Sequence, residues 1–257
     1  MKSCMKLLPL IAVLSLVFLV GCSKDNGTGP TTPVDPQGWI NLAWSQYEAG
    51  DYGGAGNSFD SGYLLAVSDS LAAYLDSTNA AHANPPDSVG IQAAVAQLKT
   101  ARGQIFQIAS GGGWVSLRLG MPGQANNNFI AALGLYAPYI DSLGLTYVHI
   151  EILGGYAFTL QALANWVQSN ERATSTLALS PTWSFTHDTQ FNYLDLRLVR
   201  VENNFNMGQF QASLDEALAL NAIVDPSSPL GPDDFNLATM AGYTKLQQLI
   251  YTLDDLI

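Results

Sequence analysis

Basic residues are scarce in this chain. Its 257 residues include 10 lysines and arginines against 21 aspartates and glutamates, which gives a formal net charge of −11 at pH 7. Proteins bind nucleic acids and anionic lipid headgroups through basic patches, and a surface of this sign repels both. We therefore expect neither nucleic acid nor a surface of anionic headgroups as a partner.

Groups that carry catalysis or bind metal are few as well. The three histidines, His82, His149 and His187, lie far apart in the sequence, and no two of them have metal-ligand spacing. There is no Gly-x-Ser-x-Gly elbow, no phosphate-binding loop and no His-Glu-x-x-His helix. His187-Asp188, near Trp183, is the only combination of polar and aromatic residues that suggests chemistry, but adjacent side chains usually point apart. We expect a helix N-cap at Asp188, no metal, no cofactor and no enzymatic activity.

Long apolar runs are absent except near the N-terminus. Residues 1–6 carry two lysines, residues 7–20 are almost wholly apolar, and Gly21 precedes Cys22. This order of segments is typical of a secretory signal. Its last four residues, Leu-Val-Gly-Cys, resemble the lipobox of bacterial lipoproteins. The resemblance implies cleavage after residue 21 and acylation of Cys22; a plain secretory signal or a short membrane anchor is the alternative.

Acylation of Cys22 would anchor the protein to a membrane without a spanning helix. Each buried methylene contributes about 0.8 kcal/mol, and stable anchoring needs more than one acyl chain. The other cysteine, Cys4, lies in the leader, so the remaining chain could form no internal disulfide. Loss of the leader also removes Lys2 and Lys6 and no acid, which changes the formal charge to −13. The sequence thus predicts a lipid-anchored, acidic protein of the cell envelope.

Residues 22–37 are expected to form a flexible tether between the lipid and the folded part. Apart from Val34 this stretch has no large apolar residue, and it is rich in Gly, Thr and Pro. Ser23 follows the lipidated cysteine. An Asp at this place retains enteric lipoproteins in the inner membrane, so Ser23 resembles the outer-membrane class. Whether the protein faces the periplasm or the cell surface stays open.

Residues 38–257 have the pattern of helices. Apolar residues recur at helical spacing, the alternation typical of strands is scarce, and turn signals come every 10 to 20 residues. The predicted fold class is all-α.

One pair of helices recurs along this region. In the first copy a helix ends near Gly50 and a second one follows, with the small residues Ala43 and Ala55 where the two would touch. The positions that define this copy are Trp39, Leu42, Ala43, Gly50, Asp51, Tyr52, Ala55, Phe59 and Gly62. Similar patterns surround Gly120 and Gly208. The spacing resembles the tetratricopeptide repeat, which implies a short α-solenoid of stacked helical hairpins, closed by a C-terminal capping helix from about Asp234.

Several features fit a repeat of about 34 residues poorly, and a generic helical bundle is the alternative. Asn84-Pro85-Pro86 stands where an intermediate turn is expected, and Gly120 and Gly208 lie 88 residues apart. A further pair of helices is predicted at 147–166 and 170–179. Glycines 111–113 are unfavourable within a helix, so either they permit very close packing or the helix starts after them.

The resemblance also implies a binding surface. In the tetratricopeptide family three positions of the first helix of each repeat usually face a concave groove. Here they are Trp44, Tyr47, Glu48, Trp114, Leu117, Arg118, Glu202, Phe205 and Asn206. Aromatic rings give a large contact area at a small entropic cost, which suits a peptide or a glycan. The alternative is that these rings pack against the next helical pair.

Taken together, the sequence predicts an envelope lipoprotein that acts as a protein-protein interaction scaffold. Its expected partner is an envelope protein or peptide, because a helical array offers a concave surface rather than a reaction centre. Binding of a glycan or a small ligand is the alternative function.

Overall fold

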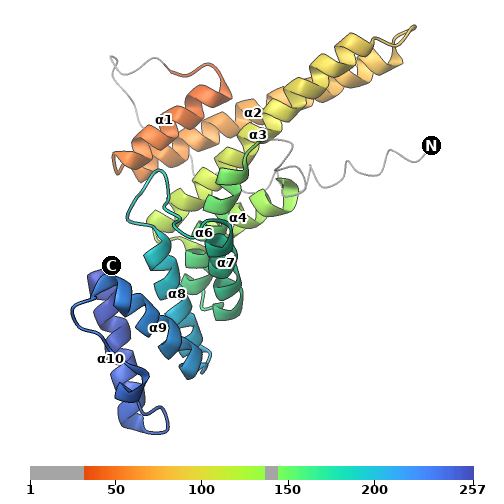
Figure 1. Ribbon diagram of the computed structural model, residues 1–257. Coiled ribbons are helices and arrows are strands. Elements are labelled where there is room, and N and C mark those ends of the chain that lie inside the picture. Colours follow the sequence, from red (N-terminus) through yellow and green to blue (C-terminus); the bar gives the residue numbers. More distant parts are fainter. Residues whose placement is uncertain (1–31, 137–143) are drawn as a thin grey trace. The chain divides into compact units, whose positions relative to one another are not determined.

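The computed structural model describes residues 32–136 and 144–257 (Figure 1). Cys22 and the lipobox lie outside these residues. The described part consists of helices, which confirms the predicted all-α class. They are α1 (Pro36–Glu48), α2 (Tyr52–His82), α3 (Ser88–Arg118), α4 (Pro122–Tyr136), α6 (Thr146–Ala162), α7 (Trp166–Leu179), α8 (Tyr193–Asn206), α9 (Phe210–Val224), the short 3-10 helix η4 (Pro232–Asp234) and α10 (Met240–Leu256). Helix α1 starts two residues inside the predicted tether, with Asp35 as its N-cap.

Four helical hairpins share one type of turn. The turns lie between α1 and α2, α3 and α4, α6 and α7, and α8 and α9, and each contains one residue with positive φ: Gly50, Gly120, Ala164 and Gly208. Each residue and its successor donate backbone hydrogen bonds back into the first helix. In the first turn, Gly50 N donates to Tyr47 O at 2.9 Å, and Asp51 N donates to Gln46 O at 2.8 Å. This geometry satisfies carbonyls that the helix end leaves free, so the helices reverse direction in a fixed way.

The turn at Ala164 corrects the expected spacing of the repeats. Ala164 lies 44 residues after Gly120 and 44 residues before Gly208, so the 88-residue interval holds two units rather than a broken one. The predicted helix at 147–166 in fact ends at Ala162, and α7 begins at Trp166 rather than at residue 170. Because alanine replaces the glycine of this turn, the sequence lacks the usual signal for it.

Small residues let the two helices of each hairpin approach closely. Ala43 and Ala55, one on each helix of the first hairpin, are both fully buried. The second hairpin has Gly113 and Ala125 at the equivalent positions. In the third and fourth hairpins serines replace the second alanine and donate across the contact: Ser169 Oγ to Ala157 O and Ser213 Oγ to Val201 O, both at 2.8 Å. At this helix contact, each hairpin therefore has either two small apolar residues or a serine whose hydroxyl is hydrogen-bonded.

Glycines 111–113 lie inside α3, so the close-packing explanation is the correct one. A Cβ on Gly111 would lie 2.1 Å from the ring of Phe59 on α2, and a Cβ on Gly113 would lie 2.4 Å from the ring of Phe129 on α4. Two large rings therefore use the space that these glycines leave.

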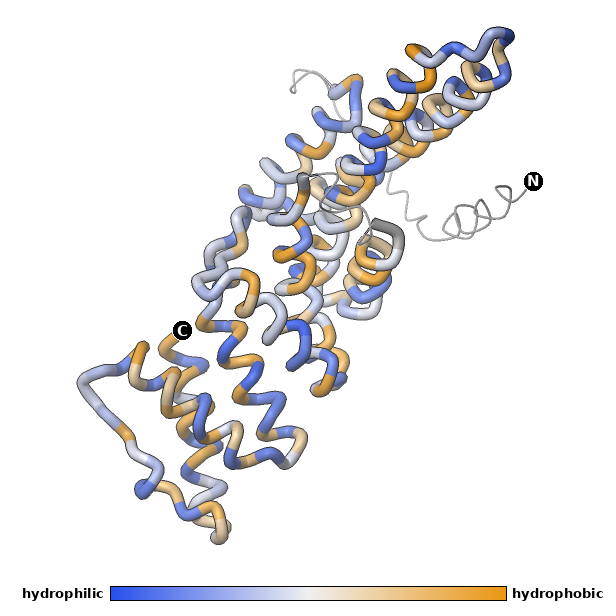
Figure 2. The backbone as a smooth tube through the Cα atoms, turned by 45° about the vertical axis from the view of Figure 1, so that its right-hand side comes forward, coloured by the Kyte–Doolittle hydropathy of each residue, from blue (hydrophilic) through white to orange (hydrophobic). Residues whose placement is uncertain are grey.

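The region expected to hold an intermediate repeat forms the long hairpin of α2 and α3 instead. Each helix has 31 residues, and the two run side by side beyond α1 and α4 (Figures 1 and 2). The buried residues of the outer part are small: Ala66, Ser70, Ala73, Ala94 and Ala101. Asn84-Pro85-Pro86 lies at the tip, where proline cannot continue a helix.

The buried apolar residues form two clusters. The larger one involves α1 to α8, and the smaller one joins α8, α9 and α10 through Leu198, Leu220, Leu246 and Leu253. Helix α10 begins at Met240, six residues later than expected, because Asp234 ends the short helix η4. No helix in the described ranges is long and apolar enough to cross a bilayer.

Candidate functional site

The predicted groove residues of the first two hairpins face a common side, but the chain itself covers that side. Residues 180–192, the closing segment, link α7 to α8 (Figure 1). Trp183 and Phe185 of this segment are buried among the rings of the larger cluster. The concave surface expected to receive a partner is therefore filled by an internal segment.

Trp114 is the residue that this segment covers most completely. Its ring stacks on Phe185, with centroids 3.8 Å apart and an interplanar angle of 12°, and Phe191 lies 5.1 Å away. Trp114 is 0% exposed and Tyr47 only 2%. The prediction that these two rings offer a surface to a partner is wrong, because both belong to the core. Leu117 also packs against this cluster.

Polar contacts hold the same segment in place. The His187 ring stacks on Trp44 at 3.8 Å with an interplanar angle of 2°, and His187 Nδ1 lies 2.8 Å from Glu48 Oε1. Arg118 Nε donates to Asp188 Oδ2 at 2.8 Å, and its guanidinium lies over the ring of Phe191. Burial raises the pKa of the Tyr47 phenol, an effect that Asp188 strengthens and Arg118 opposes.

Asp188 is not the expected N-cap. That role falls to Asn192, whose side chain accepts from Leu194 N, while Asp195 accepts from Asn192 N. This reciprocal capping box places the N-cap of α8 four residues after Asp188, and Asp188 pairs with Arg118 instead.

The third set of predicted groove residues lies elsewhere. Glu202 accepts a hydrogen bond from Gln161, Phe205 packs edge-on against Phe210 at 5.3 Å, and Asn206 is exposed. Phe205 belongs to the smaller cluster. With the turn at Ala164 in place, the residue equivalent to Trp44 and Trp114 in the third hairpin is Phe158, which the sequence pattern missed. Phe158 contacts Phe191 at 5.0 Å.

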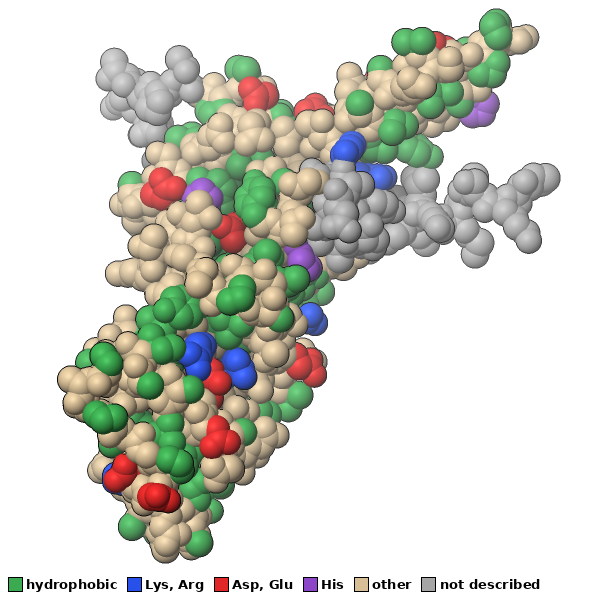
Figure 3. Space-filling view, in the orientation of Figure 1, with side chains coloured by type: hydrophobic (Ala, Val, Ile, Leu, Met, Phe, Trp, Pro, Cys, Tyr) green, Lys and Arg blue, Asp and Glu red, His purple; other side chains and the backbone are tan. Residues whose placement is uncertain are grey.

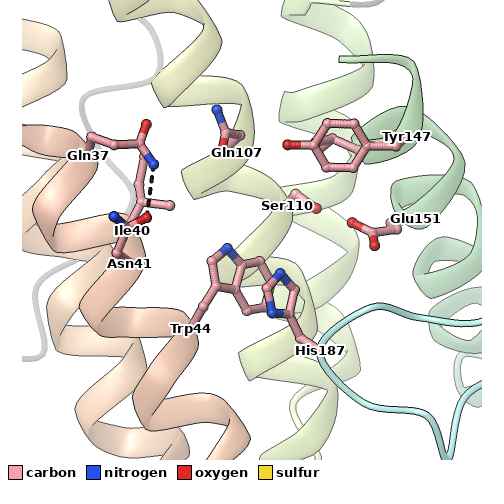
Figure 4. Close-up of a pocket in the computed structure, with 10 residues that line it drawn as sticks. Gln37, Ile40, Asn41, Trp44, Gln107, Ser110, Tyr147, Glu151 and His187 are labelled. Carbon is pink, nitrogen blue, oxygen red and sulfur yellow. Dashed lines mark hydrogen bonds between the residues drawn. The ribbon is translucent and has the colours of Figure 1, made fainter.

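A pocket of about 230 Å³ remains beside the closing segment (Figure 4). We call it the Trp44 pocket. It lies between α1, α3, α6 and the closing segment, and it is lined by Gln37, Ile40, Asn41, Trp44, Gln107, Ser110, Tyr147, Val148, Glu151 and His187. In Figure 4 the side chains of Glu151, Ser110 and Tyr147 approach the space from one side, opposite Gln37 and Asn41. A second hollow, lined in part by Trp183 and Thr186, adjoins it at Tyr147 and Glu151.

Glu151 is the ionisable group most deeply placed in the pocket. It is 6% exposed, and its Oε1 accepts from Thr186 N at 3.3 Å. Burial raises the pKa of its carboxyl, while the hydrogen bonds from Thr186 and the nearby His187 oppose the rise. Within the described residues, no three histidine, cysteine or acidic side chains gather in a way that could hold a metal ion.

An apolar stripe on α2 is the other candidate surface. Leu64, Leu71 and Leu75 are 71%, 55% and 51% exposed. Their spacing of seven and four residues puts them on one face of the helix, opposite the small residues that contact α3. Hydrophobic side chains are visible along this hairpin in Figure 3. We call these three leucines the α2 stripe.

No protein-family model matches this chain. Its similarity to curated proteins is not significant either. The function therefore has to be inferred from the two surfaces above and from the N-terminal motif.

Proposed function

We propose that this chain is a lipid-anchored protein of the cell envelope whose helical array serves as a scaffold for another protein. The lipobox at Cys22 and Ser23 after it support an anchor in the outer membrane. Stacked helical hairpins with a common turn support a repeat protein related to the tetratricopeptide class. A scaffold function suits this architecture, because stacked helical hairpins offer an extended surface for contact rather than a reaction centre.

The α2 stripe is the observation that carries the proposal. The concave side is closed by residues 180–192, so the contact surface is assigned to the outer face of the long hairpin. Exposed apolar side chains arranged along one helix face are typical of a helix that packs against another helix. Exposure of three leucine side chains to water is unfavourable in free energy, and their burial against a partner would remove this cost.

The charge of α2 indicates the chemistry of the partner. Asp60, four residues before Leu64, lies beside the stripe, and the helix contains no lysine or arginine. A second copy of the same face would bring like charges together. An anionic lipid surface would also be repelled. The partner surface that fits is an apolar helix flanked by basic residues.

Site-specific cross-linking tests this proposal. A photoreactive residue replaces Leu71 in the full-length lipoprotein, and the host membranes are irradiated. A matched variant carries the same residue at Asp69, which is exposed on the opposite face of α2. We expect an adduct from position 71 but not from position 69, joined to a peptide with apolar helical spacing and flanking lysines or arginines. Leu64→Glu and Leu75→Glu should remove it. Equal adducts from both faces, or none from position 71, contradict the proposal.

The Trp44 pocket supports a second function, binding of a glycan or a small polar ligand. It is enclosed on several sides, and its lining combines rings with polar groups, as in many ligand sites.

A further inference from the structure

The lining of the Trp44 pocket is unusually rich in neutral polar groups. It holds three carboxamides, from Gln37, Asn41 and Gln107, together with the hydroxyls of Ser110 and Tyr147. Carboxamides and hydroxyls both donate and accept hydrogen bonds. The lining contains no lysine or arginine, and its one carboxylate is that of Glu151. An anionic ligand would find no cation to pair with, apart from His187 when protonated.

Ser110 points to a missing hydrogen-bond partner. Its side chain is 1% exposed, and its Oγ makes no hydrogen bond within the described part of the chain. By contrast, the buried Ser116, Ser169 and Ser213 each donate to a backbone carbonyl. Because buried polar groups are nearly always satisfied, an unpaired hydroxyl facing a cavity favours a ligand that supplies the partner.

Rings flank the same space. The stacked pair of Trp44 and His187 forms one side, and Tyr147 lies across the space from it (Figure 4). The volume of about 230 Å³ is below the range usual for drug-sized ligands, so the space suits a single small ring.

We propose that the Trp44 pocket binds one neutral sugar ring. A sugar carries hydroxyls around its whole edge, so it can use the carboxamides, Ser110, Tyr147 and the Glu151 carboxylate together. Gln37 already donates to Asn41, and Gln107 to Gly103 O, but both keep further hydrogen-bonding capacity. A small amine would need the carboxylate alone and would leave the Ser110 hydroxyl without a partner. The sugar is either a free monosaccharide or the terminal residue of an envelope glycan. This inference adds a ligand class to the second function above and is independent of the α2 stripe.

Calorimetric titration of the lipidated protein, in a detergent without a sugar headgroup, tests the ligand class. The probes are glucose, galactose, mannose and N-acetylglucosamine, with putrescine as the cationic comparison. We expect saturable binding of at least one sugar and none of putrescine. Binding of putrescine alone would overturn the sugar assignment but keep a ligand function for the pocket. Binding of no probe would overturn both.

Two serines on α3 provide a matched pair of variants. Ser110→Ala removes a hydroxyl that has no protein partner, so the thermal midpoint should stay unchanged while sugar affinity falls about tenfold. Ser116→Ala, six residues later, removes a hydroxyl that bonds to Gly112 O outside the pocket and should leave the affinity unchanged. Glu151→Gln should also weaken binding. If Ser110→Ala binds the sugar as the wild type does, the pocket is not the site.

Oligosaccharides that end in the sugar found by titration distinguish its two sources. Affinity for the free monosaccharide equal to that for the oligosaccharide indicates that one ring fills the site. Tighter binding of the oligosaccharide that Ser110→Ala still weakens assigns the pocket to the terminal residue of a glycan.

Discussion

The imidazole of His187 lies flat on the indole of Trp44, with ring centroids 3.8 Å apart and planes 2° from parallel. Trp44 belongs to the first helix of the array, whereas His187 lies in the segment between α7 and α8. This contact fixes a distant segment over the side of the helices where the repeat pattern places a groove. It accounts both for the closed concave side and for the pocket beside it.

Truncation of Trp114 should destabilise the fold. The ring is fully buried against Phe185, Phe129 and Phe191, so Trp114→Ala leaves a large cavity and should lower the free energy of unfolding by about 3–5 kcal/mol. Urea denaturation followed by circular dichroism measures this change. A loss below about 1 kcal/mol would mean that the ring is not part of the core.

Replacement of Ala164 by glycine should stabilise the protein. Ala164 has φ of 56°, a conformation that costs an L-residue about 1–2 kcal/mol, while glycine adopts it freely but loses more backbone entropy on folding. Ala164→Gly should therefore raise the free energy of unfolding by up to about 1 kcal/mol. Ala72→Gly, at an exposed position inside α2, should lower it by about 1 kcal/mol. If both variants lose stability equally, the positive φ at Ala164 carries no strain.

Stability should increase as the pH falls from neutral. Burial raises the folded-state pKa of Glu151 above its ordinary value of 4.5, and the pKa values of Asp195 and Glu202 are raised for the same main reason. Between the ordinary and the raised pKa the folded state binds more protons than the unfolded state. The stabilising contribution is complete below the ordinary pKa and is lost as the pH rises through the folded value.

Thermal unfolding at a series of pH values checks this expectation. The glutamine in Glu151→Gln does not titrate, so the stability of this variant should decline less between acidic and neutral pH than that of the wild type. Glu202→Gln should have the same effect. A wild-type protein whose stability rises steadily from pH 5 to pH 7 would contradict the sign of these shifts.

Loss of Cys22 should release the protein from the membrane. Cys22→Ala, made behind a secretory leader that is cleaved without a lipobox, removes both the acceptor of the proposed acyl chains and the apolar residues 7–20. Fractionation of host cells should find the wild type with the membranes and the variant in the aqueous fraction. Mass spectrometry of the wild-type N-terminal peptide should find acyl groups on residue 22. An unmodified cysteine there would rule out the lipoprotein assignment.

Local sequence signals were enough to predict much of the fold. Gly50, Gly120 and Gly208 mark helix ends because only glycine adopts positive φ without strain, and small residues on both sides of each turn indicate close helix contacts. The turn at Ala164 was missed because the residue with positive φ there is not a glycine. Asn84-Pro85-Pro86 stands out in the sequence only as a poor fit to an intermediate repeat, and nothing local shows that the two flanking helices continue for 31 residues each.

The site was harder to predict, because it depends on contacts between distant parts of the chain. His187-Asp188 and the nearby Trp183 form a polar cluster with an aromatic neighbour in the sequence, whereas Phe185 and Phe191 give no such signal. The sequence does not show that the closing segment packs against Trp44 and Trp114, because that contact depends on tertiary packing and leaves no periodic pattern. Ser110 gave no signal at all, since its importance lies in the hydrogen bond that it does not make.

Photo-cross-linking at Leu71 and at Trp44 of the full-length protein, in host membranes, tests most directly which surface would meet the proposed partner. With the concave side closed by residues 180–192 and the α2 stripe exposed, position 71 should give an adduct with another protein, and position 44 should cross-link only within the chain. A partner adduct at position 44 that is absent at position 71 would show that the concave side opens and that the α2 stripe is not the contact surface.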